Sequence, residues 1–240
     1  MFAGPNGSGK SELKKYLEPH LLGVYLNPDE IEKEARTRGF LELSAFGVTT
    51  TEREILPFFS DSSFLISGGL DEAAKRLEFA DGRLIFANVE MNSYFASVAV
   101  DFFRQKLMEQ KDTFTFETVM SHPSKVELLA KAQAAGYRTY LYFIATDDPA
   151  INIARVRGRV IDGGHGVPED RIADRYHRSL NLLREAIRHT NRAFIFDNSA
   201  DNEDHTWLVE ITNGRDLELK TDRIPAWFKR SVLDKINQAS

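Results

Sequence analysis

Cysteine is absent from the 240-residue sequence. This absence excludes a disulfide framework, a thiolate nucleophile and a cysteine zinc site, and it fits a reducing cytoplasm. No apolar run approaches the roughly 18 residues of a membrane span, and the N-terminus lacks the apolar stretch of a signal peptide. We therefore expect a soluble, cytoplasmic protein that makes no membrane contact.

An excess of positive charge is also missing, since the sequence has 31 basic and 36 acidic residues and a formal net charge of −5. No global field draws such a protein to nucleic acid, so we expect no nucleic-acid partner and only a local anion site. The sequence is rich in core-forming residues, with 42% hydrophobic and 11% aromatic side chains. This content excludes disorder and predicts one large domain over residues 1–240.

Short apolar runs alternate with segments of helical period, which is typical of a parallel sheet flanked by helices. The predicted strands are the stub before Gly4 and residues 24–27, 113–118, 137–146 and 193–197. The predicted helices are residues 93–110, residues 124–135 with Ser124 and Glu127 at capping-box spacing, and a segment that begins at Pro168. The apolar face of this last helix consists of Ile172, Tyr176, Leu180, Leu183 and Ile187. The expected fold is a three-layer α/β sandwich.

Two segments depart from this alternation. Residues 40–92 are rich in Ser, Thr, Gly and Phe without a clean period, so we interpret them as an insertion. Near the C-terminus, Asn213-Gly214 is the preferred dipeptide of a type I′ hairpin, here between residues 207–212 and 215–220. With a last helix over residues 225–238, this hairpin predicts a small appendage at 205–240.

The N-terminal segment carries the clearest chemical motif. It consists of Gly4, Pro5, Asn6, Gly7, Ser8, Gly9, Lys10 and Ser11, and it matches G-x-x-x-x-G-K-[ST] at every required position. In such a P-loop, backbone N–H groups curl around a phosphate, the lysine reaches the β and γ phosphates, and the Ser hydroxyl binds Mg²⁺. We predict a nucleoside triphosphate site in which Lys10 and Ser11 start the first long helix. A glycine-rich turn with a purely structural role is the alternative. The strand before the loop is short, because only three residues precede Gly4, and we expect the native chain to begin earlier.

Acidic residues follow three of the predicted strands. Asp29 lies at the carboxyl edge of the sheet, where open α/β folds bind ligands and a kinase needs a proton acceptor. Alternatively, Asn27 caps a helix whose first turn contains Asp29. Glu117 could hold Mg²⁺ directly or through water. Asp147 is its rival, although a cap of the following helix would also explain that residue.

Arginines surround a glycine-rich segment in the second half of the chain. Arg155, Arg157 and Arg159 precede Gly163-Gly164-His165-Gly166, and a basic stripe of Arg171, Arg175 and Arg178 follows. Cations on a glycine-hinged segment suit a lid, here residues 152–180, that neutralises a transferring phosphoryl group. His165 could donate to a phosphate from the same loop. The alternative is a solvated helix face paired with Asp162, Asp170 and Asp174.

Taken in order, these motifs resemble the zeta-toxin family of kinases. The resemblance rests on residues 3–11, 26–29, 116–118, 163–165, 167–169 and 175–180, and it covers residues 1–39 and about 95–200. It implies ATP- and Mg²⁺-dependent phosphorylation of a small nucleotide-linked molecule. In the best-known members the acceptor is the 3′-hydroxyl of the amino sugar in UDP-N-acetylglucosamine, and its phosphorylation poisons cell-wall synthesis.

The resemblance also implies roles for single residues. Asp29 becomes the base, Lys10 and Ser11 contact phosphate and magnesium, and Glu117 is the acidic residue at the strand end. Arg155 and Arg159 join the lid as a phosphate clamp. A small helical antitoxin often holds members of this family, so such a partner is implied as well. The chain departs from the family at His165, where some members have a lid arginine, and over residues 40–92, which have no counterpart.

Two other functions stay open at this point. The acceptor could be an antibiotic or another nucleotide conjugate, or the chain could be a nucleotide-gated module that mainly binds a protein partner through residues 40–92. A GTPase switch is disfavoured because the sequence has no Asn-Lys-x-Asp motif.

If the kinase assignment holds, Asp29 and Glu117 should share one cleft with Lys10, because phosphoryl transfer depends on positioning around one γ-phosphate.

Overall fold

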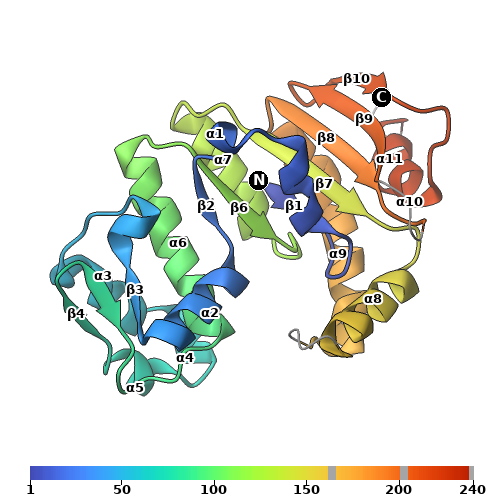
Figure 1. Ribbon diagram of the computed structural model, residues 1–240. Helices are drawn as coiled ribbons and strands as arrows, with labels where there is room; N and C mark the ends of the chain where they lie inside the picture. Colours follow the sequence, from blue (N-terminus) through green and yellow to red (C-terminus); the bar gives the residue numbers. More distant parts are fainter. Residues whose placement is uncertain (162–165, 201–204, 238–240) are drawn as a thin grey trace. The chain divides into compact units, whose positions relative to one another are not determined.

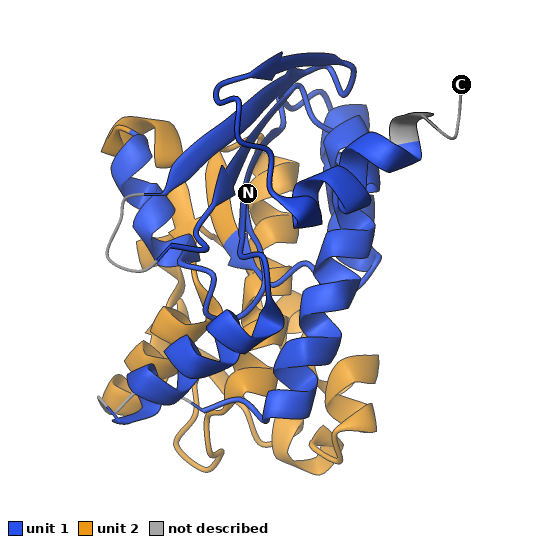
Figure 2. Ribbon diagram, turned by 90° about the vertical axis from the view of Figure 1, so that its right-hand side faces the viewer, with its two compact units in different colours: residues 1–17, 117–240 blue, residues 18–116 orange. Residues whose placement is uncertain are grey.

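The computed structural model describes residues 1–161, 166–200 and 205–237. The chain divides into two compact units: unit 1 comprises Met1–Leu17 and Glu117–Ser240, and unit 2 comprises Glu18–Phe116 (Figure 2). Within the described ranges, no helix has the length and apolar character needed to span a bilayer.

Unit 1 is built on a mainly parallel sheet (Figure 1). Its strands are β1 (Phe2–Ala3), the end of β6 (Phe114–Thr118), β7 (Tyr140–Ala145), β8 (Arg192–Asp197), β9 (Thr206–Thr212) and β10 (Asp216–Leu219). The short β1 lies between β6 and β7 and pairs in parallel with both, and β8 continues the parallel order beyond β7. β1 and β7 are apolar and largely buried, as expected for a parallel sheet covered on its faces. The predicted α/β fold with a mainly parallel sheet is confirmed.

The C-terminal segment contributes to the same unit. Asn213 and Gly214 both have positive φ, at 51° and 67°, as the predicted type I′ turn requires. This turn joins β9 to β10, and β9 pairs antiparallel with β8, so the hairpin extends the central sheet. The predicted final helix is instead divided into α10 (Ala226–Phe228), a π-helical turn η3 (Lys229–Leu233) and α11 (Asp234–Asn237). Trp227 and Phe228 in this segment are fully buried.

The remaining helices of unit 1 are η1 (Lys10–Tyr16), α7 (Ser124–Ala134), α8 (Pro149–Ile161) and α9 (Glu169–Arg188). The apolar residues predicted for α9 are buried, and α7 and α8 both pack against this helix. The predicted capping box of α7 is wrong. Ser124 already belongs to the helix, and its backbone N–H donates to Nδ1 of His122 at 3.2 Å. The His122 side chain therefore replaces the predicted reciprocal bonds between Ser124 and Glu127.

The helix that begins at Lys10 differs from the prediction in length and type. It is a 3₁₀ helix of seven residues rather than a long α-helix. Leu17 and Glu18 are extended, and α1 (Pro19–Leu22) follows as a separate turn in unit 2. Proline disfavours the helical conformation in the residue before it, which explains why η1 does not continue through Glu18.

Unit 2 combines one parallel strand pair with a separate antiparallel sheet. β2 (Val24–Leu26) pairs in parallel with the first half of β6, and α2 (Pro28–Arg38) packs against α6 (Ser93–Gln110). The second sheet has the order β3-β5-β4, from β3 (Phe40–Glu42), β5 (Arg83–Ile85) and β4 (Glu78–Ala80). Between β3 and β4 lie η2 (Leu43–Phe46), α3 (Glu52–Ser60), α4 (Ser63–Ser67) and α5 (Asp71–Ala74). The segment read as an insertion is therefore ordered, and its β4–β5 turn at Asp81-Gly82 has positive φ at both residues.

Aromatic rings form the core of unit 2. Phe59 of α3 and Phe95 of α6 are fully buried and stack with their ring centroids 6.5 Å apart. Phe86 meets Phe95 edge-on at 6.0 Å, and Phe46 stacks on Phe103 at 4.6 Å. These contacts join α3, η2 and Phe86 to α6, so side-chain packing holds the segment together.

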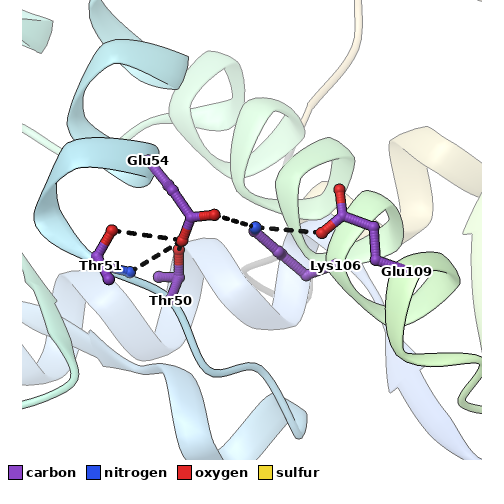
Figure 3. Close-up of polar contacts among 5 residues, drawn as sticks. All are labelled: Thr50, Thr51, Glu54, Lys106 and Glu109. Atoms are coloured by element: carbon purple, nitrogen blue, oxygen red, sulfur yellow. Dashed lines mark hydrogen bonds and ion pairs between the residues drawn. The ribbon is translucent and has the colours of Figure 1, made fainter.

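A polar network on the surface of unit 2 also links α3 to α6 (Figure 3). Glu54 accepts hydrogen bonds from the hydroxyl of Thr50 and from the backbone N–H of Thr51, the N-cap residue of α3. Nζ of Lys106 lies 2.7 Å from the Glu54 carboxylate and 3.1 Å from that of Glu109. The hydrogen bond from Lys106, with those from Thr50 and Thr51, lowers the pKa of Glu54 to about 2.

Candidate functional site

The glycine-rich loop connects β1 to η1, and close backbone approaches require glycine at Gly4 and Gly7. A Cβ atom on Gly4 would lie 2.0 Å from the carbonyl oxygen of Ile144. On Gly7, at φ +73°, it would lie 2.6 Å from the carbonyl oxygen of Asn152. Gly9 has φ +94° and starts η1, so the loop enters the helix through a left-handed residue. A larger residue at Gly4 or Gly7 would have to displace backbone atoms, whereas at Gly9 it would meet the side chains of Asn198 and His205.

Lys10 and Ser11 follow the loop at the first two positions of η1. Nζ of Lys10 donates to the carbonyl oxygens of Gly4 at 2.9 Å and Pro5 at 2.8 Å. The ammonium group therefore folds back over the start of the loop, whereas Ser11 is exposed to solvent. A cation and an exposed hydroxyl thus stand next to each other beside a glycine loop.

Two buried polar atoms of the loop have no hydrogen-bond partner among the described residues. They are Oγ of Ser8, a fully buried residue, and Oδ1 of Asn6. Almost all buried polar atoms in folded proteins are paired, so these two mark a place that a polar ligand or water can complete.

Two asparagines that the sequence analysis missed hold the loop from outside. Nδ2 of Asn152 in α8 donates to the carbonyl oxygen of Asn6 at 2.6 Å, and Nδ2 of Asn198 donates to that of Ser8 at 2.9 Å. Asn152 could have been found as a polar residue between two isoleucines at the start of a predicted helix. Asn198 directly follows a strand, a position that often supplies site residues in α/β folds.

The arginines of α8 have different environments. Arg155 donates to the carbonyl oxygens of Asn198 at 2.7 Å and Ala200 at 3.1 Å, so it is tied to the loop after β8. Arg159 is exposed on the same helix. Arg157 pairs with Glu169 at 2.5 Å, and this hydrogen bond lowers the pKa of Glu169. His165 lies outside the described residues.

The basic stripe of α9 is partly neutralised. Arg178 pairs with Asp174 at 2.5 Å, as the solvated-face interpretation predicted, while Asp162 lies outside the described residues. The described part of the predicted lid thus contains arginines paired with carboxylates, Arg157 and Arg178, and an arginine bound to backbone carbonyls, Arg155.

Asp29 lies in unit 2, in the first turn of α2. Asn27 caps this helix, because its Oδ1 accepts the backbone N–H groups of Asp29 at 2.9 Å and Glu30 at 3.4 Å. The predicted capping role of Asn27 is therefore confirmed. The Asp29 side chain itself is exposed to solvent.

Glu117 lies near the end of β6 and Asp147 follows the end of β7, and these are the two strands on either side of β1. Glu117 pairs with Phe2 across the β6–β1 ladder and is half-buried, and the strand continues to Thr118. Asp147 has a structural contact, since its Oδ1 accepts the backbone N–H of Trp227 at 3.3 Å. The residue that caps α8 is Asp148, whose Oδ1 accepts the N–H of Ala150 at 2.7 Å.

Asp147 and Asp148 also border a cavity of about 530 Å³. Tyr176, Trp227 and Arg230 contribute to its walls. Within the described ranges, no cluster of three or more His, Asp or Glu side chains is arranged to hold a metal ion. The loop, Lys10, Ser11, Arg155 and Glu117 all belong to unit 1, whereas Asp29 belongs to unit 2.

Two solved structures resemble the chain in fold. The complex of AvrRxo1-ORF1 with AvrRxo1-ORF2 and sulphate ions aligns with a TM-score of 0.52 and 13% identity, over 92% of this chain and 60% of that one. The complex of the same two proteins with ATP gives a TM-score of 0.52 and 14% identity, over 91% and 60%. The chain thus spans about three fifths of the solved chain that it resembles.

Sequence comparisons find two further similarities. An uncharacterized protein of Haemophilus influenzae is 32% identical over 69 residues, which are 29% of this chain and 49% of that protein. The alignment with this curated relative thus spans about half of the relative's length. The model of the family "Zeta toxin" matches residues 87–209. Because this match covers just over half of the 240 residues, the chain belongs to the zeta toxin family.

Proposed function

We propose that this protein is an ATP-dependent kinase that transfers the γ-phosphoryl group to a hydroxyl of a small molecule. The observation that carries the proposal is the loop from Gly4 to Ser11. Backbone contacts impose glycine at Gly4 and Gly7, and the Lys10 ammonium lies over the loop. Membership of the zeta toxin family supports the same activity, as does the fold shared with a protein solved together with ATP.

Each residue of the loop region has a role in this proposal. The backbone N–H groups of the loop bind the phosphates, and Lys10 neutralises charge on the β and γ phosphates. Ser11 and Glu117 would hold Mg²⁺, and their hydroxyl and carboxylate oxygens are ligands that this ion prefers. Magnesium needs only one or two protein ligands beside phosphate oxygens, so a larger acidic cluster is not required. When bound, it supplies positive charge to the triphosphate.

Asp29 is the proposed base. The acceptor oxygen bonds to the γ-phosphorus, its proton passes to the Asp29 carboxylate, and the bond from the γ-phosphorus to the bridging oxygen breaks to release ADP. Arg155, Arg159 and His165 are assigned to the clamp on the transferring group. These roles require Asp29 and Glu117 to reach the same γ-phosphate as Lys10, and this juxtaposition stays a prediction.

The proposed acceptor is a nucleotide-linked molecule, with UDP-N-acetylglucosamine as the first compound to test. An antibiotic hydroxyl or another nucleotide conjugate is the next choice. A small helical antitoxin is a proposed partner, and the related structures, which are complexes of two proteins, are in keeping with it.

A nucleotide-gated protein-binding module is the second candidate, and a surface of unit 2 favours it. Phe64 and Ile66 of α4 are 48% and 52% exposed, and Phe64 stacks on Tyr94 of α6 at 4.9 Å. Exposed aromatic side chains that gather in one place are typical of interaction surfaces. In this case ATP would control partner binding without product formation.

Product formation from ATP separates the two candidates. Purified protein is incubated with ATP, Mg²⁺ and a panel of nucleotide sugars, nucleotide conjugates and antibiotics, and the products are analysed by mass for an added phosphoryl group. Asp29→Asn should lower product formation roughly 10²-fold or more while ATP affinity is kept, because only the proton acceptor is lost. Lys10→Ala should weaken ATP binding itself.

Glu34→Gln, on the same helix as Asp29, removes a carboxylate that pairs with Arg38 and serves as the matched control. Full product formation by Asp29→Asn would refute the base assignment. If no acceptor is phosphorylated while ATP still alters partner binding, the module replaces the kinase.

A further inference from the structure

A chain of buried polar contacts runs from α9 through the end of β7 to the glycine-rich loop, all within unit 1. Thr146 and Asn152 are both fully buried. Oδ1 of Asn152 accepts the Thr146 hydroxyl, and Nδ2 of Asn152 donates to the carbonyl oxygen of Asn6 at 2.6 Å. The amide of Asn152 is therefore oriented by Thr146, with its donor end directed at the loop.

At its other end, this series of polar contacts is anchored in α9. The Tyr176 hydroxyl donates to the carbonyl oxygen of Thr146 at 2.7 Å. Burial raises the pKa of Tyr176, so the hydroxyl keeps its proton and remains a donor. At Gly7 the loop also approaches the backbone of Asn152 so closely that a Cβ atom would lie 2.6 Å from the Asn152 carbonyl oxygen.

Asn198 makes the corresponding contact two peptide groups further along the loop. Its Nδ2 donates to the carbonyl oxygen of Ser8 at 2.9 Å, and the carbonyl of Asn198 in turn accepts Arg155 at 2.7 Å. The two asparagines come from different elements and hold alternate peptide groups of the loop, those of Asn6–Gly7 and Ser8–Gly9.

Holding these two carbonyls has a direct consequence for the N–H groups of the loop. In a trans peptide the C=O and the following N–H point in opposite directions. A carbonyl fixed toward an asparagine therefore directs the N–H of Gly7, or of Gly9, to the other side. Peptides next to glycine rotate most easily, because glycine tolerates both signs of φ. Without an external bond, these two N–H groups would be the least defined in the loop.

We propose that Asn152 and Asn198 are positioning residues for the phosphate-binding loop: each fixes one glycine N–H so that it faces the triphosphate. This inference rests on the proposed function for the ligand, but the orientation of the two peptides belongs to the protein alone. It also assigns α8 a second role beside carrying arginines, since its first turns shape the loop.

Asn152→Asp is the central variant, because it keeps the shape but places an acceptor oxygen against the Asn6 carbonyl. Asn152→Ala removes the donor without adding charge, and Asn198→Asp tests the second contact independently. Asn181→Asp, at an exposed position of α9, makes the same chemical change away from the loop and is the matched control. Thermal unfolding shows which variants are folded, and ATP affinity is measured for each of them.

We expect both Asn152 variants to weaken ATP binding about 10-fold, because the Gly7 N–H is no longer held. The KM for ATP should rise while kcat at saturating ATP is retained. In ¹⁵N-labelled protein without ATP, the amide resonance of Gly7 should shift in the Asn152 variants and that of Gly9 in Asn198→Asp. Asn181→Asp should change none of these quantities.

An Asn152→Ala protein that is folded and binds ATP like the unaltered protein, with an unchanged Gly7 resonance, would overturn the inference. An effect seen only with Asn152→Asp would reduce it to simple charge repulsion and also overturn it. If the Asn152 variants do not fold, the inference is tested by the ATP affinity and the Gly9 resonance of Asn198→Asp. If the unaltered protein does not bind ATP, the proposed function fails. The Gly7 and Gly9 amide resonances then test on their own whether the two asparagines orient the loop.

Discussion

The glycine-rich loop of unit 1 and the 40–92 segment of unit 2 are both irregular in sequence, yet they are held in different ways. The loop is fixed by single polar contacts, from Asn152 and Asn198, and by backbone approaches that exclude a Cβ atom. The 40–92 segment is held by aromatic rings, such as Phe59 against Phe95. Polar contacts fix the direction of a group, whereas aromatic packing fills volume. The first is suited to a binding site and the second to a scaffold.

The largest effect is expected in the aromatic core. Phe95 is fully buried between Phe59 and Phe86, so Phe95→Ala should lower the free energy of unfolding by about 3–5 kcal/mol, measured by urea denaturation. Phe64→Ala is the matched control, because Phe64 is 48% exposed and its loss should cost less than about 1 kcal/mol. Equal effects of the two substitutions would contradict the view that ring packing holds this segment.

Two glycines with the same φ angle, one in the glycine-rich loop and one in the 40–92 segment, test the difference between the two regions. Gly7 and Gly82 both have φ +73°, so alanine adds a strain of roughly 1–2 kcal/mol at either position. Only at Gly7 does the new Cβ meet backbone, at 2.6 Å from the Asn152 carbonyl oxygen, while at Gly82 the nearest atom is a Glu42 oxygen at 3.9 Å. Gly7→Ala should weaken ATP binding about 10-fold or more, whereas Gly82→Ala should leave ATP affinity unchanged.

Titration calorimetry with ATP measures both affinities, and urea denaturation measures both stabilities. A Gly7→Ala protein with ordinary ATP affinity would mean that the loop adapts to the methyl group. Its conformation would then not be set by the contact with α8.

The smallest effect is expected at the surface network of unit 2. The pKa of Glu54 is lowered to about 2, so its contribution to stability is fully present above its unfolded value of 4.5 and is lost as the pH falls from 4.5 toward 2. Glu54→Gln should therefore be less stable than the unaltered protein at neutral pH, and the difference should disappear in that acidic range. Urea midpoints measured from pH 7 to pH 2 test this, with Glu52→Gln in the same helical turn as the control. A difference that persists at pH 2 would show that the carboxylate charge is not its cause.

Several features of the fold could be predicted because they depend on neighbouring residues. The strand positions followed from apolar runs, the hairpin from Asn213-Gly214, and the helix over 93–110 from its period. The capping of α7 could not be predicted, because the reciprocal bonds expected between Ser124 and Glu127 compete with the side chain of His122, which is also a near neighbour in sequence. Asp148 rather than Asp147 caps α8 for a different reason, since Asp147 is engaged by Trp227, 80 residues away.

The loop from Gly4 to Ser11 and the capped helix that carries Asp29 could be predicted from the residues alone, because glycine spacing and helix capping are local properties. The contacts that hold the loop depend on how distant segments pack. Asn152 and Asn198 stand about 150 and 190 residues from it in the chain, and parallel strand order brings them to the same edge of the sheet. Tertiary packing also decided the structure of residues 40–92, since rings from separate short elements pack there without a repeating pattern along the chain.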